Sequence, residues 1–391
     1  MKFDFDEPVN RENTNSVKFD LREKLFGRPG ILPMWVADMD FKVPPAVAEA
    51  VQQRARHEIY GYSIRPDSFY QSAIGWMKRR HGWTIDRSWL TFTPGIVPGV
   101  NLSILALTQP GDKVMIQPPV YFPFFHGIRK NNREIVENRL ILKDGRYHVD
   151  FDDFKKQLQE GVRMFILSNP HNPGGSVWTH DELKQMGELC THYGATIIAD
   201  EIHGDIVFPG HHYVPMASIS AEIAENTITF VAPSKTFNIA GLATSVSIIS
   251  NKNLREAFNE MLERTHIANG NLFGTVAMEA AYNKGEQWLD ELLRYLVGNL
   301  DLIEEYTRER LPGIELVRPE GTYLAWLDCR GLPVETKQVN RFMIDQAHVG
   351  MNDGASFGQN GAGFQRLNFG CPRQTLRKAL TQIERAINDL K

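Results

Sequence analysis

The regular alternation of short apolar runs with segments of helical periodicity is the feature that most constrains the fold. Five runs have the length and composition of buried strands, at residues 113–116, 163–167, 195–199, 228–231 and 245–249. Helical patterns lie between and before them, at 45–56, at 67–81, from Gly95 to Thr108, and from a capping box at Thr179 to Gly194. Strands that alternate with helices form βα units, so we predict an α/β fold with a mostly parallel central sheet flanked by helices.

The pattern changes at both ends of this region. Residues 1–45 are polar and then proline-rich, which predicts an extended arm. Beyond residue 285 the sequence predicts a long helix at 288–310, a strand pair that includes 322–327, and a final helix from Gln374. We therefore expect an N-terminal arm at 1–45 that joins the small domain, a large domain at 46–285, and a small α+β domain at 286–391.

Composition excludes several classes of function. The net charge is −4 and no basic run exceeds three residues, which argues against nucleic acid or an anionic membrane as the main partner. No apolar run approaches the roughly 18 residues of a membrane span, and the N-terminus has no signal-peptide core. The three cysteines are odd in number and widely spaced, as in reduced thiols, and the histidines lack metal-ligand spacing. We expect a cytoplasmic protein without a metal.

Three polar residues follow predicted strands. Lys235 follows the run at 228–231, Asp200 ends the run at 195–199, and Asn172 follows the run at 163–167. Because ligands of open α/β sheets gather at the carboxyl ends of the strands, all three are expected in one crevice. A lysine that can form an imine, an acid that can face a pyridinium nitrogen and an amide donor are the parts that a pyridoxal 5′-phosphate (PLP) site needs. The alternatives are a surface lysine, a capping acid and a turn asparagine.

A phosphate site is predicted at the start of the helix that follows Thr93. Gly95 allows close approach of the backbone, and the free N–H groups of Gly95, Ile96 and Val97 would face an anion. Ser234, beside Lys235, is a second candidate donor.

Eight segments carry a resemblance to a known family. They are 33–41 (PMWVADMDF), 60–62 (YGY), 93–98 (TPGIVP), 118–121 (PPVY), 169–175 (NPHNPGG), 199–203 (ADEIH), 233–238 (PSKTFN) and 364–369 (FQRLNF). In this order they resemble fold type I PLP enzymes of the class I/II aminotransferase superfamily. The sequence is most similar to the cystathionine β-lyase branch of that superfamily, the MalY/PatB type.

The resemblance implies a role for each candidate residue around the cofactor. Lys235 would hold PLP covalently and then act as the base for the substrate's α-proton. Asp200 would pair with the pyridine nitrogen, Asn172 would bond the phenolic oxygen O3′, and Tyr121 would stack on the ring, the alternative for Tyr121 being a core aromatic. Tyr60 and Tyr62 would reach the phosphate of a neighbouring subunit's cofactor, which implies a homodimer with active sites at the interface; the alternative is a plain turn.

The resemblance also implies how an amino-acid substrate is held. Arg366 would bind its α-carboxylate in a bidentate fork, with an internal salt bridge as the alternative. Asn172 and the backbone at Ala37 would help to close that site.

Departures from the aminotransferase pattern favour another reaction. His203 stands three residues after Asp200, where aminotransferases usually have a tyrosine, and we expect it to contact the cofactor. Ala232 and Ala243 stand where aminotransferases tend to have a serine and an arginine. These forms resemble the C–S lyase branch, which implies cleavage of L-cystathionine or related cysteine S-conjugates to a thiol, pyruvate and ammonia. An aminotransferase is the alternative enzyme. A regulatory binding protein of the same branch, with a protein partner, is the alternative of a different class.

Overall fold

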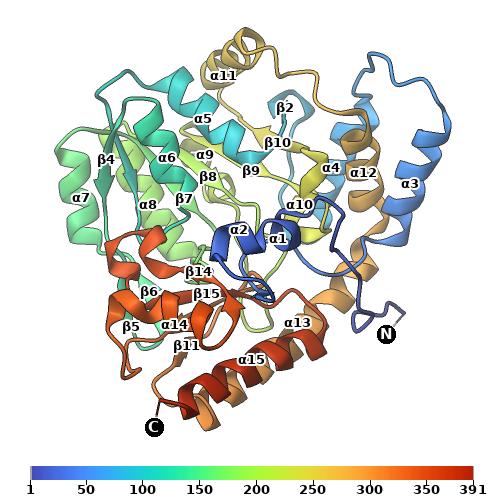
Figure 1. Ribbon diagram of the computed structural model, residues 1–391. Helices are drawn as coiled ribbons and strands as arrows, with labels where there is room; N and C mark the ends of the chain where they lie inside the picture. The colour runs from blue at the N-terminus through green and yellow to red at the C-terminus, as the bar shows by residue number, and fades with distance from the viewer. Residues whose placement is uncertain (1, 391) are drawn as a thin grey trace.

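The computed structural model describes residues 2–390 and is built around a seven-stranded sheet (Figure 1). Its strand order is β2-β10-β9-β8-β7-β3-β4. The strands are β2 (Leu90–Thr93), β10 (Ser245–Ile248), β9 (Thr227–Val231), β8 (Thr196–Asp200), β7 (Val162–Ser168), β3 (Lys113–Ile116) and β4 (Glu134–Glu137). Only β10 runs antiparallel to its neighbours, β2 and β9. The prediction of an α/β fold with a mostly parallel sheet is therefore confirmed.

Helices cover both faces of this sheet. Successive side chains of a strand point to opposite faces, and apolar residues occur on both, so both faces must be buried. In β7, Met164 and Ile166 join one core and Phe165 and Leu167 join the other. The first core also contains α5 (Ile96–Leu107), α6 (Pro123–Lys130) and α11 (Lys252–Arg264). The second contains α7 (Phe151–Gln159), α8 (His180–Tyr193) and α9 (Ala221–Glu225). The predicted capping box of α8 is present, with Thr179 and Glu182 bonding reciprocally.

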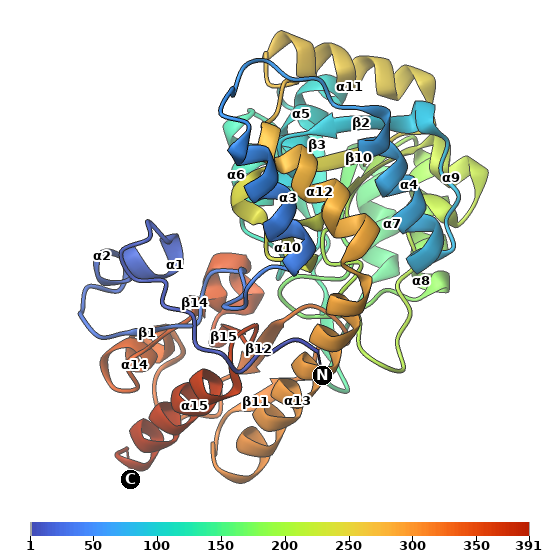
Figure 2. The ribbon, with the colours of Figure 1, turned by 90° about the vertical axis from the view of Figure 1, so that its right-hand side faces the viewer.

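The C-terminal part forms a second layer beside the first (Figure 2). Its antiparallel sheet has the order β11-β12-β15-β14. The strands are β11 (Glu315–Val317), β12 (Leu324–Asp328), β15 (Phe364–Asn368) and β14 (Asn352–Asp353), and the helices are α13 (Glu286–Glu309), α14 (Val339–Asp345) and α15 (Arg373–Asn388). Three more helices, α3 (Pro45–Arg56), α4 (Asp67–His81) and α12 (Leu272–Lys284), pack on one another in the first layer. No helix within residues 2–390 is long and apolar enough to cross a membrane.

The N-terminal arm differs in part from the extended segment that we predicted. Residues 17–26 form two short helices, α1 (Val17–Asp20) and α2 (Arg22–Phe26), so the prediction was wrong there. The reason is local: the Asp20 carboxylate accepts backbone N–H groups from Asn13 and Ser16 at 2.8 and 2.9 Å, which folds this polar stretch on itself. Farther along, β1 (Leu32–Pro33) pairs in parallel with β13 (Val349–Gly350).

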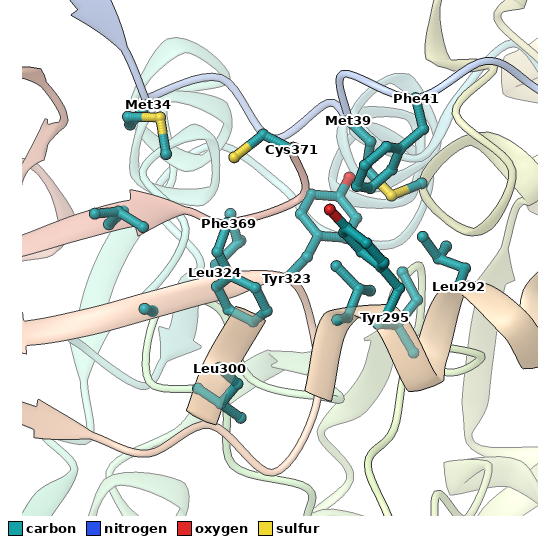
Figure 3. Packing of buried hydrophobic residues seen from close by; sticks show 14 of the residues in the cluster. Met34, Met39, Phe41, Leu292, Tyr295, Leu300, Tyr323, Leu324, Phe369 and Cys371 are labelled. Carbon is teal, nitrogen blue, oxygen red and sulfur yellow. The ribbon is translucent and has the colours of Figure 1, made fainter. Parts of the chain in front are cut away.

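Apolar residues of the arm are buried against the small domain. Figure 3 shows Met39 and Phe41 of the arm beside Tyr295 of α13 and Tyr323, with Met34 at a distance from these tyrosines. The ring of Phe41 meets that of Tyr295 edge to face, with centroids 5.6 Å apart. The arm therefore has a defined course, which matters because residues 35–41 pass the candidate site.

Candidate active site

A cavity of about 210 Å³ opens at the carboxyl ends of the parallel strands. Ten of the predicted site residues line it: Ala37, Gly95, Ile96, Val97, Tyr121, Asn172, Asp200, His203, Ser234 and Lys235. They come from segments as far apart as the N-terminal arm and β9. The cavity therefore lies where ligands of open α/β sheets bind, at the carboxyl ends of the strands.

Asp200 is the last residue of β8 and lies buried in this cavity. Its carboxylate accepts one backbone N–H, from Ile202 at 3.2 Å, and no cationic side chain within residues 2–390 forms an ion pair with it. Burial raises the pKa of Asp200 to about 6, against the lowering effects of that bond and of the Lys235 charge. A buried acid without a cation fits a ligand that carries a protonated pyridine.

Lys235 lies on the one-turn helix α10 (Pro233–Thr236), directly after β9. Its Nζ donates to the backbone oxygen of Ala37. Burial lowers the pKa of Lys235 to about 8, although the carboxylates of Asp38 and Asp200 oppose the effect. A lysine with this pKa has a larger neutral fraction near pH 7 than an exposed one, as a nucleophile or a base requires.

The phosphate site at the start of α5 needs one correction. Gly95 has φ = +126°, a backbone conformation that favours glycine, as expected. Its N–H is not free, however, because it donates to Ser245 Oγ at 3.1 Å. The amides of Ile96 and Val97 belong to the first helical turn and have no intrahelical acceptor. Ser234 and Thr244 line the same cavity, but the Thr244 hydroxyl donates to Met278 Sδ at 3.9 Å. The donors that remain for an anion are the amides of Ile96 and Val97 and the hydroxyl of Ser234.

Arg366 on β15 is buried, with an exposed fraction of 3%. It donates to Asn172 Oδ1 at 2.9 Å, Asn352 Oδ1 at 2.7 Å and the Trp35 carbonyl at 3.0 Å, while its Nε has no partner. No carboxylate of the described residues pairs with it, so the alternative of an internal salt bridge is not realised. Burial lowers the pKa of Arg366 to about 10. A buried guanidinium without an anion fits the carboxylate of a ligand.

Two ring side chains complete the wall of the cavity. Tyr121 is held edge to face against Phe124, with centroids 5.8 Å apart. Burial lowers the pKa of His203 to about 3, and the charges of Lys235 and Arg366 lower it further, so its imidazole is neutral. Its Nδ1 is buried without a partner, which leaves a polar atom for a ligand.

Tyr60 and Tyr62 do not join this cavity. Both are exposed on the loop between α3 and α4, which projects from the first layer (Figure 1). The Tyr60 hydroxyl donates to the Ala55 carbonyl at 2.6 Å. Within one chain, these residues have no contact with the other candidates.

Several residues of the site were not predicted. Ser168 and Thr244 line the cavity, Asn352 binds Arg366, and the Tyr323 hydroxyl donates to the Ala37 carbonyl at 3.0 Å. A signal existed for Ser168, which ends a predicted apolar run. Thr244 precedes a strand, and only an antiparallel β10 brings that end to the cavity. Nothing local marks Asn352 or Tyr323.

A mostly parallel α/β sheet whose strand ends bring together a partly buried lysine, an acid without a cation and a helix N-terminus defines a PLP-dependent enzyme of fold type I. The chain belongs to the aminotransferase class I and II family, whose model matches residues 30–383. It is 42% identical to cystathionine β-lyase PatB of Bacillus subtilis over 98% of this chain and 100% of that protein.

Solved structures agree with this assignment. A PLP-bound protein from Clostridium difficile 630 superposes with a TM-score of 0.97 at 44% identity, covering 99% of this chain and 100% of that one. Cystalysin from Treponema denticola, which contains PLP, gives a TM-score of 0.97 at 35% identity, with both chains fully covered. The predicted fold type and the predicted cofactor, PLP, are thereby confirmed, as is the resemblance to the cystathionine β-lyase branch.

Proposed function

We propose that this protein is a C–S β-lyase that cleaves L-cystathionine or related cysteine S-conjugates to a thiol, pyruvate and ammonia. The similarity to cystathionine β-lyase PatB over the full length of both chains carries this proposal. The site supports it, because a partly buried lysine of lowered pKa lines the cavity, and a buried guanidinium without an anion lies behind its wall, bonded to the lining residue Asn172. These are the groups needed to hold an amino acid and to remove its α-proton.

The residues present fit PLP. Lys235 would hold it through its amine, the Asp200 carboxylate would pair with the ring nitrogen, and the side-chain amide of Asn172 would donate to O3′. When bound, PLP supplies an electron-poor ring that accommodates the electron pair left on the substrate's Cα. Six further residues that line the cavity would contact the ring and the phosphate of the cofactor: Gly95, Ile96, Val97, Tyr121, His203 and Ser234.

The protein's own groups perform the remaining steps. Arg366 binds the substrate's α-carboxylate and exchanges its bonds to Asn172, Asn352 and Trp35 for bonds to that anion. Lys235, as a neutral amine, takes the proton from Cα. The C–S bond then breaks with loss of the β-thiolate, which completes the elimination, and water hydrolyses the released 2-aminoacrylate to pyruvate and ammonia.

The assembly is part of the proposal. We propose a homodimer in which Tyr60 and Tyr62 of one subunit reach the cofactor phosphate of the other, because both tyrosines are exposed and lie outside the cavity of their own chain. The division into an arm (1–45), a large domain (46–285) and a small domain (286–391) follows the two sheets. The cytoplasm is the proposed compartment, and the three free, buried cysteines suit its reducing conditions.

The reaction is tested with L-cystathionine as the only substrate. Wild-type holoenzyme is expected to release thiol, ammonia and pyruvate continuously, with no keto acid added. Pyruvate is followed by its reduction with lactate dehydrogenase and NADH. If product formation stops after one turnover per subunit and restarts only when a keto acid is added, the protein is an aminotransferase.

Arg366→Ala tests how the substrate is held. Truncating one side of a desolvated charge pair costs about 2–5 kcal/mol, so kcat/KM for L-cystathionine should fall roughly 30- to 4,000-fold. The cofactor should remain bound, because Arg366 has no role in holding it. Arg308→Ala, at an exposed position of α13, is the matched control and should change kcat/KM less than about twofold. An unchanged KM and kcat in Arg366→Ala would place the substrate carboxylate elsewhere.

A further inference from the structure

Residues 35–41 of the arm cross the site, and side chains from both sides hold their backbone. Arg366 donates to the Trp35 carbonyl at 3.0 Å. Lys235 Nζ and the Tyr323 hydroxyl both donate to the Ala37 carbonyl, the latter at 3.0 Å. The arm therefore contacts both residues to which the substrate is assigned.

Asn238 binds the arm from the lysine side. It lies three residues after Lys235, and its Nδ2 donates to the carbonyls of Met39 at 2.9 Å and Phe41 at 2.7 Å. Its Oδ1 accepts the Met39 N–H at 3.0 Å. One amide side chain thus makes three hydrogen bonds to the backbone of the arm, which ties this segment to the loop that carries the lysine.

Asn368 binds the arm from the arginine side. Its Nδ2 donates to the carbonyls of Val36 and Asp38, the latter at 2.6 Å, and its Oδ1 accepts the Gly370 N–H at 2.8 Å. Asn368 therefore holds the residues on either side of Ala37, and Asn238 holds Met39 and Phe41 directly beyond them. The Ala37 carbonyl itself is left for Lys235 and Tyr323.

We propose that Asn238 is a positioning residue of the reaction, which fixes the arm so that the Ala37 carbonyl holds the Lys235 amine in the orientation that removes the substrate's α-proton. This inference rests on the proposed role of Lys235 as the base. It assigns to Asn238 an effect on proton transfer that acts through Met39, Ala37 and Lys235, without contact with the substrate.

The chemistry of the amine explains why a fixed carbonyl matters. Neutral Lys235 has two N–H groups and one lone pair, and the carbonyl can accept only an N–H, so the lone pair points elsewhere. During proton transfer the Cα–H bond breaks, its electron pair stays on the substrate, and a third N–H bond forms on Nζ. The resulting ammonium is a stronger donor to the same carbonyl. Displacement of a reacting group by about 1 Å can cost on the order of 100-fold in rate, so a loose arm should slow this step.

Asn238→Gly is the variant of choice. Asn238 has φ = +57°, a left-handed conformation that glycine adopts without strain, so the variant removes the side chain and keeps the backbone. The matched control is Asn299→Ala. Asn299 is fully buried, whereas Asn238 is partly buried, and the Nδ2 of Asn299 likewise bridges two carbonyls, Phe369 at 3.0 Å and Cys371 at 2.9 Å, but it does not bind residues 35–41.

The measurement is exchange of the Cα proton of L-alanine for deuterium, followed by NMR with each holoenzyme in D2O. Alanine has no leaving group, so the exchange reports proton transfer alone. Asn238→Gly should lower the saturated exchange rate by about tenfold or more and change the half-saturating alanine concentration by less than about threefold. Asn299→Ala should keep the exchange rate within about twofold of wild type while losing some thermal stability.

A second readout uses the cofactor-free full-length protein. With its carbonyl partner loosened, Lys235 of Asn238→Gly should react with acetic anhydride about threefold faster than in wild type, measured by peptide mass spectrometry against the exposed Lys252 of the same sample. If Asn238→Gly does not fold, Asn238→Asp is used. The carboxylate still accepts the Met39 N–H but cannot donate to the carbonyls of Met39 and Phe41, so the same decrease in exchange rate is expected.

Two results overturn the inference: wild-type exchange in Asn238→Gly, or equal losses in Asn238→Gly and Asn299→Ala. A failure of the proposed lyase function can be told apart from these two results, because it is seen in the wild-type enzyme. A wild-type enzyme that exchanges alanine but forms no pyruvate from cystathionine overturns the lyase proposal and leaves the role of Asn238 in place. A wild-type enzyme that does neither overturns both.

Discussion

Lys235→Ala is expected to leave a folded protein whose turnover has fallen by at least about 10²–10⁴-fold, the usual contribution of a general base. The fold should tolerate the change, since Lys235 is only partly buried and forms no direct ion pair within the described residues. PLP should bind weakly and only noncovalently. The measurements are turnover with L-cystathionine, circular dichroism, and dialysis of the cofactor followed by absorbance.

Chemical mapping makes the same prediction specific to one residue. Borohydride reduction of the wild type, followed by peptide mass mapping, should place the pyridoxyl group on Lys235. Lys252→Ala, at a lysine whose side chain is 76% exposed, is the control and should keep both the adduct and the turnover. An adduct on any other lysine would remove the basis of the proposed site.

The fold was predictable from sequence where strands are buried on both faces. The central strands β7, β8 and β9 lie within a residue of the predicted runs, because a continuous apolar run is the signature of such strands. The edge strands β2 and β4 were not predicted. Their sequences, LTFT and EIVE, mix polar with apolar residues, so neither contains the continuous apolar run on which the prediction of buried strands relied.

The site was predictable to the extent that it depends on strand direction. Asp200, Lys235 and Asn172 follow parallel strands, whose carboxyl ends share one edge. Thr244 and Ser245 reach the same edge from the start of an antiparallel strand, which no local pattern reveals. The capture of the Gly95 N–H by Ser245 Oγ was missed for that reason.

Residues outside the large sheet could be assigned only by resemblance. Ala37 lines the cavity and Arg366 lies beside it through the packing of the arm and the small domain. Such packing depends on contacts between residues more than 300 positions apart, as between Trp35 and Arg366. The positions of Tyr60 and Tyr62 in the assembly depend on a second chain, so their role stays a prediction.

Asp200→Asn is expected to remove nearly all turnover and, at the same time, to stabilise the cofactor-free protein. Turnover should be lost because a neutral amide cannot keep the pyridine nitrogen protonated, which the electron sink requires. Stability should rise because burial raises the pKa of Asp200 to about 6 from the ordinary 3.8, so the folded cofactor-free protein carries a carboxylate without a cation at neutral pH. That difference corresponds to roughly 3 kcal/mol.

The pH dependence follows from the sign of this shift. Because the folded pKa lies above the unfolded one, the carboxylate destabilises the fold fully above pH 6, and the effect disappears as the pH falls below 3.8. The gain in free energy of unfolding of Asp200→Asn over wild type should therefore be largest near pH 8 and small near pH 4. Urea titrations of both cofactor-free proteins at the two pH values measure it. Saturating PLP should reverse the order at pH 8, since only the wild-type carboxylate gains a cation. If Asp200→Asn were less stable than wild type without cofactor and kept a turnover within a few-fold, Asp200 would be a structural turn residue.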